Sequence, residues 1–408
     1  MTTPRMVEGV VCPFCSLACD DLVLMVDGVA LQPVQPACPI AAHEFARPLG
    51  DGACRIDGAP AELAAAIARA AEILAGARLP LLAGLGTDVA GVRAALALAE
   101  RLGGVVDHAG TAGLLANVRT TQDEGWVTAT LAEVRNRADL VLFVGTDASR
   151  VMPGLVEHVL RPSDGLFGPL ARELVYLGDG LTPVHDLGPV TALPCAPARL
   201  PAVLASLRAA VAGHGGSQDE LAALAGRLRA ARYPVIVWAA GELPGGHPDL
   251  LVGALAGLIR ELNRQGRCVG LPLAGPDNVI GVNQVCAWQT GVPLRTSLAA
   301  GVPDHDPVRW STATLLASGA IDALLWIGSL RELPPPAVDV PTVALLRSGI
   351  EPGRPVEVLI PVGTPGLDHG GSLYRTDGVV AVPVRELRTT GLPSVATVLG
   401  HLLQACAA

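Results

Sequence analysis

Hydrophobic positions change their spacing along the chain, and this change separates predicted helices from predicted strands. Residues 61–75 and 92–102 place apolar side chains three or four positions apart, as amphipathic helices do. Residues 79–85 and 140–144 are instead short, nearly continuous apolar runs. Strands that helices cover on both faces have this composition, so the alternation predicts parallel sheets in an α/β fold.

The N-terminal stretch follows another pattern. Apolar runs at residues 7–11 and 21–26 flank a cysteine-rich segment. The second run leads into Asp27 and Gly28, a pair typical of hairpin turns, and then into a third run at residues 29–31. We therefore predict a small β-rich unit that carries its cysteines on a loop between strands.

Two internal similarities suggest how the rest of the chain is divided. Residues 77–80 (ARLP) are echoed by residues 231–234 (ARYP), and residues 138–145 are echoed by residues 321–328. They indicate two related Rossmann-like α/β domains, although any two buried strands can share such short apolar similarity. The predicted division is a β-rich cysteine unit at residues 1–58, a first parallel α/β domain at residues 59–215, and a second at residues 216–408 whose C-terminal segment packs back.

Composition narrows the function classes. The 408 residues include 50% hydrophobic and 16% charged residues, with a net charge of −9, which disfavours binding to nucleic acid or to an anionic membrane. The apolar runs are far shorter than the roughly 20 residues that a membrane-spanning helix needs. No apolar signal region follows Met1, so we expect a cytoplasmic protein in which nine cysteines stay reduced.

Three cysteines within eight residues are the strongest chemical signal. Cys12, Cys15 and Cys19 have spacings that let thiolates converge on zinc or an iron–sulfur cluster, and Cys38 or Cys54 could complete the set. The alternative is that they are small buried apolar residues, as free cysteines often are. The other cysteines are scattered singly and are expected in the core: Cys195, Cys268, Cys286 and Cys406.

Four stretches in this order carry a resemblance to a known family. They are residues 12–21 with the cysteine triplet, residues 37–45 with Cys38, residues 288–293 (WQTGVP) and residues 371–379 (GSLYRTDGV). The sequence resembles the B subunit of formylmethanofuran dehydrogenase, a member of the molybdopterin oxidoreductase-like proteins, over essentially its full length. The resemblance implies the same layout of a cysteine unit followed by two α/β domains.

The resemblance also implies a ligand set. By the family pattern the metal ligands are Cys12, Cys15, Cys19 and Cys38, and Cys54 is a spare. Their expected occupant is a [4Fe–4S] cluster; zinc is the rival, and reduced cysteines without metal are the third possibility.

The family's dehydrogenases hold tungsten or molybdenum through a cysteine in the loop after the second strand of the first α/β domain. Here residues 107–115 (DHAGTAGLL) contain no cysteine. Asp107 and His108 precede the expected position, and His108 is interpreted as a structural residue at the strand end. We therefore expect no tungsten or molybdenum pterin.

This departure makes the sequence similar to the B-like subunit of the bacterial formyltransferase/hydrolase complex, as do residues 117–130 and 131–139. The resemblance implies one-carbon metabolism from formaldehyde to formate with tetrahydromethanopterin and methanofuran-type carriers. It implies amidohydrolase-like, formyltransferase-like and C-like partner subunits, and a chain that is not itself catalytic. Two alternatives stay open: a catalytic tungsten or molybdenum formylmethanofuran dehydrogenase subunit, and a stand-alone metal-binding protein.

Overall fold

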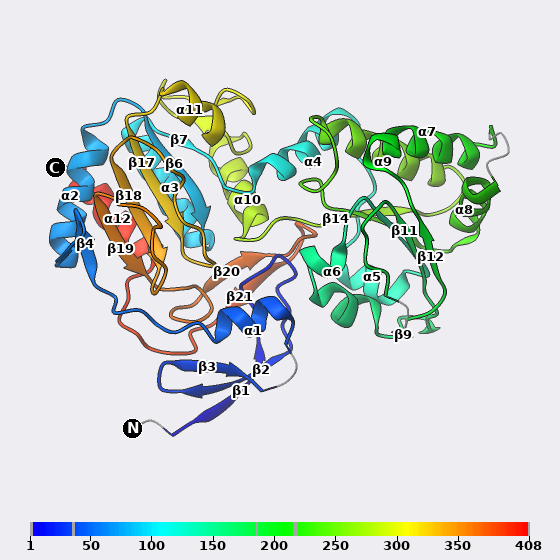
Figure 1. Cartoon of the computed structure of the whole chain (residues 1–408), viewed down its shortest axis with the longest axis horizontal. Helices are drawn as coiled ribbons and strands as arrows, with labels where there is room; N and C mark the ends of the chain where they lie inside the picture. The colour runs from blue at the N-terminus through cyan, green and yellow to red at the C-terminus, as the bar shows by residue number, and fades with distance from the viewer. Residues whose placement is uncertain (1–2, 35–36, 185–186, 215–218, 407–408) are drawn as a thin grey trace. The chain divides into compact units, whose positions relative to one another are not determined.

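A computed structural model describes residues 3–34, 37–184, 187–214 and 219–406 (Figure 1). Its contacts divide the chain into two compact units. The discontinuous unit combines Met1–Thr111 with Pro276–Ala408, and the inserted unit is Ala112–Gly275. Each unit contains its own α/β sheet.

The inserted unit is built on a five-stranded parallel sheet with the strand order β12-β11-β8-β13-β14. Its central strand β8 is buried along its whole length, as the apolar run at residues 140–144 predicts. The strands are β8 (Leu140–Val144), β11 (Glu173–Leu177), β12 (Val190–Leu193), β13 (Pro234–Trp238) and β14 (Val269–Pro272).

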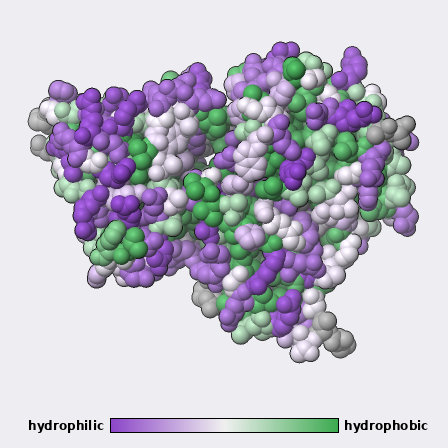
Figure 2. Space-filling model, turned by 180° about the vertical axis from the view of Figure 1, so that it is seen from behind, coloured by the Kyte–Doolittle hydropathy of each residue, from purple (hydrophilic) through white to green (hydrophobic). Residues whose placement is uncertain are grey.

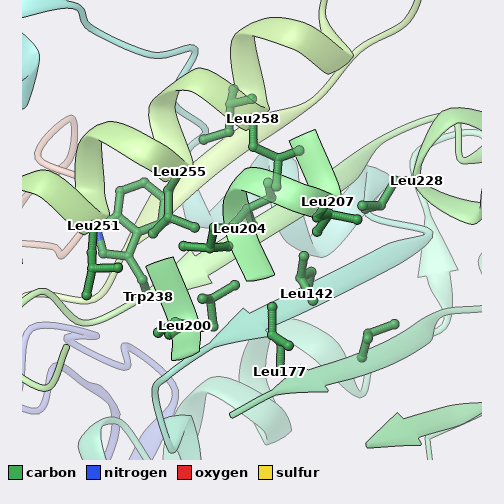
Figure 3. Packing of buried hydrophobic residues seen from close by; sticks show 14 of the residues in the cluster. Leu142, Leu177, Leu200, Leu204, Leu207, Leu228, Trp238, Leu251, Leu255 and Leu258 are labelled. Atoms are coloured by element: carbon green, nitrogen blue, oxygen red, sulfur yellow. The ribbon is translucent and has the colours of Figure 1, made fainter. Parts of the chain in front are cut away.

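Leucines from helices and strands surround Trp238 in the core of this unit (Figure 3). The Trp238 indole is fully buried, and its Nε1–H donates to Asn117 Oδ1 at 2.9 Å, so the burial leaves no polar atom unsatisfied. The helices are α4 (Thr111–Asp123), α5 (Leu131–Arg137), α6 (Ala148–Val151), α7 (Leu200–Val211), α8 (Asp219–Ala230) and α9 (Pro248–Leu262), with a π-helical turn at Val156–Leu160, a 3₁₀ turn at Pro197–Arg199 and a hairpin of β9 (Asp164–Gly165) and β10 (Gly168–Pro169).

The discontinuous unit has a nine-stranded mixed sheet with the order β16-β15-β7-β6-β17-β18-β19-β4-β5. The five central strands, from β7 to β19 in this order, run parallel. Toward both edges each further strand is antiparallel to its neighbour, at β7-β15-β16 and at β19-β4-β5. The strands are β4 (Cys54–Ile56), β5 (Ala59–Ala61), β6 (Pro80–Gly86), β7 (Val105–Val106), β15 (Thr296–Ser297), β16 (Asp304–His305), β17 (Ala323–Gly328), β18 (Thr342–Arg347) and β19 (Val358–Val362).

Local sequence explains where the helices of this unit begin and end. The helix α3 starts three residues before the predicted range because the Asp88 side chain accepts a hydrogen bond from Gly91 N at 3.0 Å, and it ends at Gly103, whose φ of 65° suits glycine. The helices are α1 (Pro39–Phe45), α2 (Leu63–Ala75), α3 (Val89–Leu102), α10 (Val279–Thr290), α11 (Thr312–Ser318) and α12 (Val395–Ala405). A hairpin of β20 (Gly371–Tyr374) and β21 (Ala381–Val384) lies between β19 and α12 in the chain.

The N-terminal β-rich unit is confirmed as a three-stranded antiparallel sheet of β1 (Arg5–Val10), β2 (Leu22–Asp27) and β3 (Ala30–Pro33). Asp27 pairs with Ala30 across the predicted hairpin, and Gly28 has the positive φ of 58° that this turn requires. The cysteine triplet lies on the connection from β1 to β2, also as predicted.

The internal similarity corresponds to a reciprocal pairing of strands. β6, which follows ARLP, pairs with β17, and β13, which follows ARYP, pairs with β8. At the start of the first pair, Asp322 accepts hydrogen bonds from Arg78 N and Leu79 N, both at 2.9 Å. At the start of the second, Asp139 accepts from Arg232 N and Tyr233 N at 2.7 and 2.9 Å. Each strand of one repeat therefore pairs with a strand of the other.

Because strands pair across the two repeats, the observed units do not follow one another along the chain as the predicted domains do. Strands from both predicted α/β domains share each of the two main sheets, because β6 joins β17 and β8 joins β13. The short strand β4, from the predicted cysteine unit, also pairs with β19 at the sheet edge. The predicted boundary between residues 215 and 216 lies outside the described residues.

Surface hydropathy is mixed. Hydrophilic and hydrophobic residues are interspersed on the face of the molecule shown in Figure 2. In the ranges that the structure describes, no helix combines the length and the hydropathy that crossing a membrane requires.

The two aspartates give a matched test of the exchanged pairing. Asp139→Ala and Asp322→Ala each leave two backbone N–H groups without their acceptor, so we expect each to lower the free energy of unfolding by about 1–3 kcal/mol. Calorimetry should place the loss in the transition of the inserted unit for Asp139 and of the discontinuous unit for Asp322. Glu100→Ala, at an exposed carboxylate, is the control, and equal transition temperatures for all three variants would contradict this role.

Candidate functional site

The cysteine loop is a compact turn held by its own backbone. Cys12 N donates to Cys19 O at 2.8 Å, and Ala18 N donates to Cys15 O at 3.1 Å. Ala18 has a φ of 46°, which is unusual for a residue with a side chain and reverses the chain ahead of Cys19. The sequence therefore folds the triplet back on itself, as its spacing predicts.

Cys38 joins this loop from another segment. It is the N-cap residue of α1, and its Sγ accepts a hydrogen bond from Ala41 N at 3.4 Å. Cys12 belongs to an apolar cluster that also contains the fully buried Phe14, and Cys19 and Cys38 pack against this cluster. Cys54 lies in β4 instead.

The environment disfavours isolated thiolates. Burial raises the pKa of Cys12 well above its ordinary value, and the charge of Cys15 raises it further. Burial also raises the pKa of Cys15, although hydrogen bonds from Leu17 N–H and Ala18 N–H act in the opposite direction. Burial and then the charge of Cys15 raise the pKa of Cys19. The thiols therefore stay protonated unless a cation compensates their charge.

This donor set fits a soft cation in its chemistry. Cys12 is buried and the other three cysteines are partly buried, and backbone N–H groups donate to the sulfurs of Cys15 and Cys38, as they do around ligated thiolates. As they stand, however, no three Cys, His, Asp or Glu side chains in the described part of the chain are gathered closely enough to hold a metal ion. Metal ligation by Cys12, Cys15, Cys19 and Cys38 therefore stays a prediction.

A buried ion pair connects the cysteine region to the large sheet. Arg347, at the end of β18, donates from Nη1 to Glu44 Oε2 and from Nη2 to Glu44 O, both at 2.8 Å. The two side chains are 3% and 6% exposed. The guanidinium also lies 5.1 Å from the ring centroid of Phe14, and Phe14 packs edge-on against Phe45 of α1. Burial lowers the pKa of Arg347 to about 10, so it remains charged at neutral pH.

A second connection runs from the loop after β20. Arg375 Nη2 donates to Ala18 O at 3.1 Å and pairs with Asp20 Oδ2 at 2.9 Å. Thr376 N donates to Ser16 O at 2.7 Å. These bonds connect the cysteine loop to residues 371–379, one of the four stretches that carry the family resemblance.

His108 is a hydrogen-bonding residue of the interior. Gly110 N–H, which can only donate, points at His108 Nδ1 at 2.8 Å, so Nε2 carries the proton and donates to Asp277 O at 3.0 Å. Burial lowers the pKa of His108 to about 4. Both ring nitrogens are thus engaged, in agreement with the structural role expected for this residue.

Asp107 is engaged as well. Its Oδ2 accepts from Thr312 N and from Thr312 Oγ1, both at 2.8 Å, and its Oδ1 accepts from His108 N at 2.9 Å. Oδ2 therefore connects the end of β7 to the first residue of α11, while Oδ1 accepts from the backbone of the next residue in the chain. That neither Asp107 nor His108 replaces the metal thiolate implied by the family resemblance stays a prediction.

Sequence reasoning missed a strained pair, Asp277 and Asn278, before α10. Both have left-handed φ angles, 60° and 59°. Asn278 Nδ2 donates to Thr87 O, and its Oδ1 accepts from Tyr374 N, each at 2.9 Å. Asp277 Oδ1 is buried and finds no hydrogen-bond partner among the described residues. Burial raises the pKa of Asp277 to about 6, against the opposing charge of Arg331.

A signal for this pair exists in the sequence. Pro276, Asp277 and Asn278 stand between an apolar run and a helical pattern, which is where the carboxyl end of a strand meets a helix. The Glu44 and Arg347 pair has no such signal, because its partners are 303 residues apart.

The chain is similar in sequence to known proteins over most of its length. No protein-family model matches the chain. The chain is 36% identical over 333 residues to the B subunit of the formyltransferase/hydrolase complex Fhc of Methylorubrum extorquens, which covers 80% of this chain and 89% of that protein. It is 26% identical over 402 residues to the B subunit of the tungsten-containing formylmethanofuran dehydrogenase 2 of Methanocaldococcus jannaschii, or 92% of each protein.

A solved structure shows the same fold. One chain of the crystal structure of the complex FhcABCD from Methylorubrum extorquens, determined with methylofuran, superimposes with a TM-score of 0.76 and 32% sequence identity. The match covers 87% of this chain and 99% of that chain. The predicted resemblance and the predicted α/β fold class are both confirmed.

The buried pair of His108 and Asp277 predicts compensating pH effects. The pKa of His108 is about 4 in the folded chain, against 6.5 in the unfolded chain. This residue therefore destabilises the fold as the pH falls from 6.5 to 4. The pKa of Asp277 is about 6 in the folded chain, against 3.8 in the unfolded chain. This residue therefore stabilises the fold as the pH falls from 6 to 3.8. Between pH 6 and 4 the two effects oppose each other.

Substituting either residue should reveal the pH effect of the other on stability. Relative to the unmodified chain, we expect Asp277→Asn to lose stability more steeply between pH 6.5 and 4, and His108→Gln to lose it less steeply. Calorimetric unfolding temperatures at several pH values measure both slopes. If both variants run parallel to the unmodified chain, the assigned protonation states are wrong.

Proposed function

We propose, because the chain belongs to the family of formyltransferase/hydrolase complex B subunits, that it is the B-like subunit of such a complex. The observation that carries this proposal is the fold match to nearly the whole length of one chain of FhcABCD. The complex would act in the oxidation of formaldehyde to formate on tetrahydromethanopterin and a methanofuran-type carrier.

The proposed partners are the other subunits of that complex. An amidohydrolase-like subunit would release formate from the formylated carrier, a formyltransferase-like subunit would move the formyl group between carriers, and a C-like subunit would complete the assembly. The name of the related complex, with four subunits and methylofuran bound, supports this set. The chain's own contribution would be structural.

The environment of Asp107 and His108 supports a subunit without its own metal–pterin redox centre. No cysteine occurs between residues 107 and 115, where the dehydrogenases hold their metal. The Asp107 oxygens and both His108 nitrogens are occupied by hydrogen bonds within the protein. The second candidate function is a catalytic dehydrogenase subunit, and the similarity to the B subunit of the tungsten-containing enzyme is the observation in its favour.

We also propose that Cys12, Cys15, Cys19 and Cys38 hold a structural [4Fe–4S] cluster or zinc. The four thiolates would ligate either one, and the bound metal would cross-link the loop to α1. The four residues come from two segments that share one apolar cluster, and they are free of disulfides. Reduced thiols also agree with the proposed cytoplasmic location.

Substitution at the cysteines tests the structural role. In anaerobically purified protein, Cys12→Ser and Cys15→Ser should remove most of the bound iron or zinc and lower the unfolding temperature of the discontinuous unit. Cys195→Ser, at a buried cysteine of the inserted unit, is the matched control. Equal metal content and equal unfolding temperatures in all the variants would refute metal ligation at this loop.

Omitting the chain tests its part in assembly. When the partner subunits are expressed without it, we expect at least a tenfold loss of the complete complex on size-exclusion chromatography, with a matching loss of formate release. Adding back the Glu100→Ala variant should restore both. An intact, fully active complex without this chain would contradict the proposal, and so would a chain that elutes only as a monomer beside its partners.

A further inference from the structure

A short hairpin of the inserted unit exposes two adjacent large apolar side chains. β9 and β10 pair through Gly165 and Gly168, and the two residues between them are Leu166 and Phe167. These side chains are 67% and 83% exposed. Two-residue hairpin turns normally carry Gly, Asn or Asp, because these residues suit the backbone and favour water. Local turn preference therefore does not explain this tip.

The hairpin is held firmly at its base. Arg172 is 3% exposed and donates to Leu160 O at 2.7 Å, as well as to the carbonyls of Pro162 and Arg135. Its charge is thus placed in the interior to bind three backbone carbonyls, an arrangement that fixes the chain before the hairpin.

Further bonds fix the strands themselves. Leu166 N donates to Asn136 O at 3.2 Å, and Leu170 N donates to Ser163 O at 2.8 Å. The Asp164 carboxylate lies 3.4 Å from Arg135. The tip is therefore a fixed projection, on which two apolar side chains meet water without any gain for the folding of the chain itself.

The size of the tip indicates what covers it. Two such side chains offer on the order of 300 Å², whereas a stable interface needs roughly 800 Å² from each partner. The tip is therefore too small to be a dimer face and has the size of an anchor within a larger interface. The related complex FhcABCD is built from different subunits. A partner subunit of this kind can supply the remaining area of such an interface.

We propose that Leu166 and Phe167 anchor this chain in an apolar hollow on another subunit of its complex. This inference rests on the proposed function. The anchor supplies apolar area that is already ordered, so binding loses little conformational entropy at this point.

Photo-crosslinking in the assembled complex tests the occupant. Benzoylphenylalanine placed at Phe167 should crosslink to one partner subunit in high yield, while the same group at Leu250, an exposed position of the same unit, should give little product. Crosslinks only to a second copy of this chain would overturn the proposal, as would equal yields at the two positions.

A substitution measures the strength of the contact. Phe167→Asp should weaken the affinity for the partner subunits at least tenfold and leave the unfolding temperature of the isolated chain unchanged, because the side chain is outside the core. Leu250→Asp is the control. If the unmodified chain assembles and Phe167→Asp assembles equally well, the anchor is wrong and the proposed function stands; if the unmodified chain does not assemble, both fail.

Discussion

The buried ion pair between Glu44 and Arg347 is the contact on which the rest of the discontinuous unit depends. It places a carboxylate from α1 and a guanidinium from the end of β18 out of water, where each needs the other. Removing one partner of such a pair costs about 3–5 kcal/mol, because an unpaired charge stays behind. The same guanidinium lies against Phe14 inside the cysteine loop. This one electrostatic contact therefore joins α1, the cysteine loop and the end of β18.

Around this contact, further hydrogen bonds hold the cysteine loop and the end of β7 in place. Arg375 and Thr376 bind the cysteine loop through its backbone oxygens, so the loop is fixed without direct use of its sulfurs. At the end of β7, His108 holds the strained peptide of Asp277 and Asp107 holds α11. Hydrogen bonds within the protein thus engage Asp107 and His108, whereas Asp277 Oδ1 stays without a partner among the described residues.

Local physics made much of this fold predictable from the sequence. Continuous apolar runs mark buried strands such as β8, and Asp27 with Gly28 marks the N-terminal hairpin, because both depend on neighbours in the chain. The exchange of β6 and β13 between the two repeats was not predictable, since it depends on contacts between residues 244 apart for β6 with β17 and 93 apart for β13 with β8. The same limit hides the partner of Glu44. Asp277 was missed because its strain and its unsatisfied oxygen arise only from the folded surroundings.

Elemental analysis of the complex, purified without oxygen, tests whether this chain is a B-like subunit without its own metal–pterin centre. We predict tungsten and molybdenum far below one atom per copy of this chain. The cysteine loop should hold zinc, or about four irons with an absorbance at ~400 nm. One tungsten or molybdenum per chain would contradict the account and identify the chain as a catalytic dehydrogenase subunit.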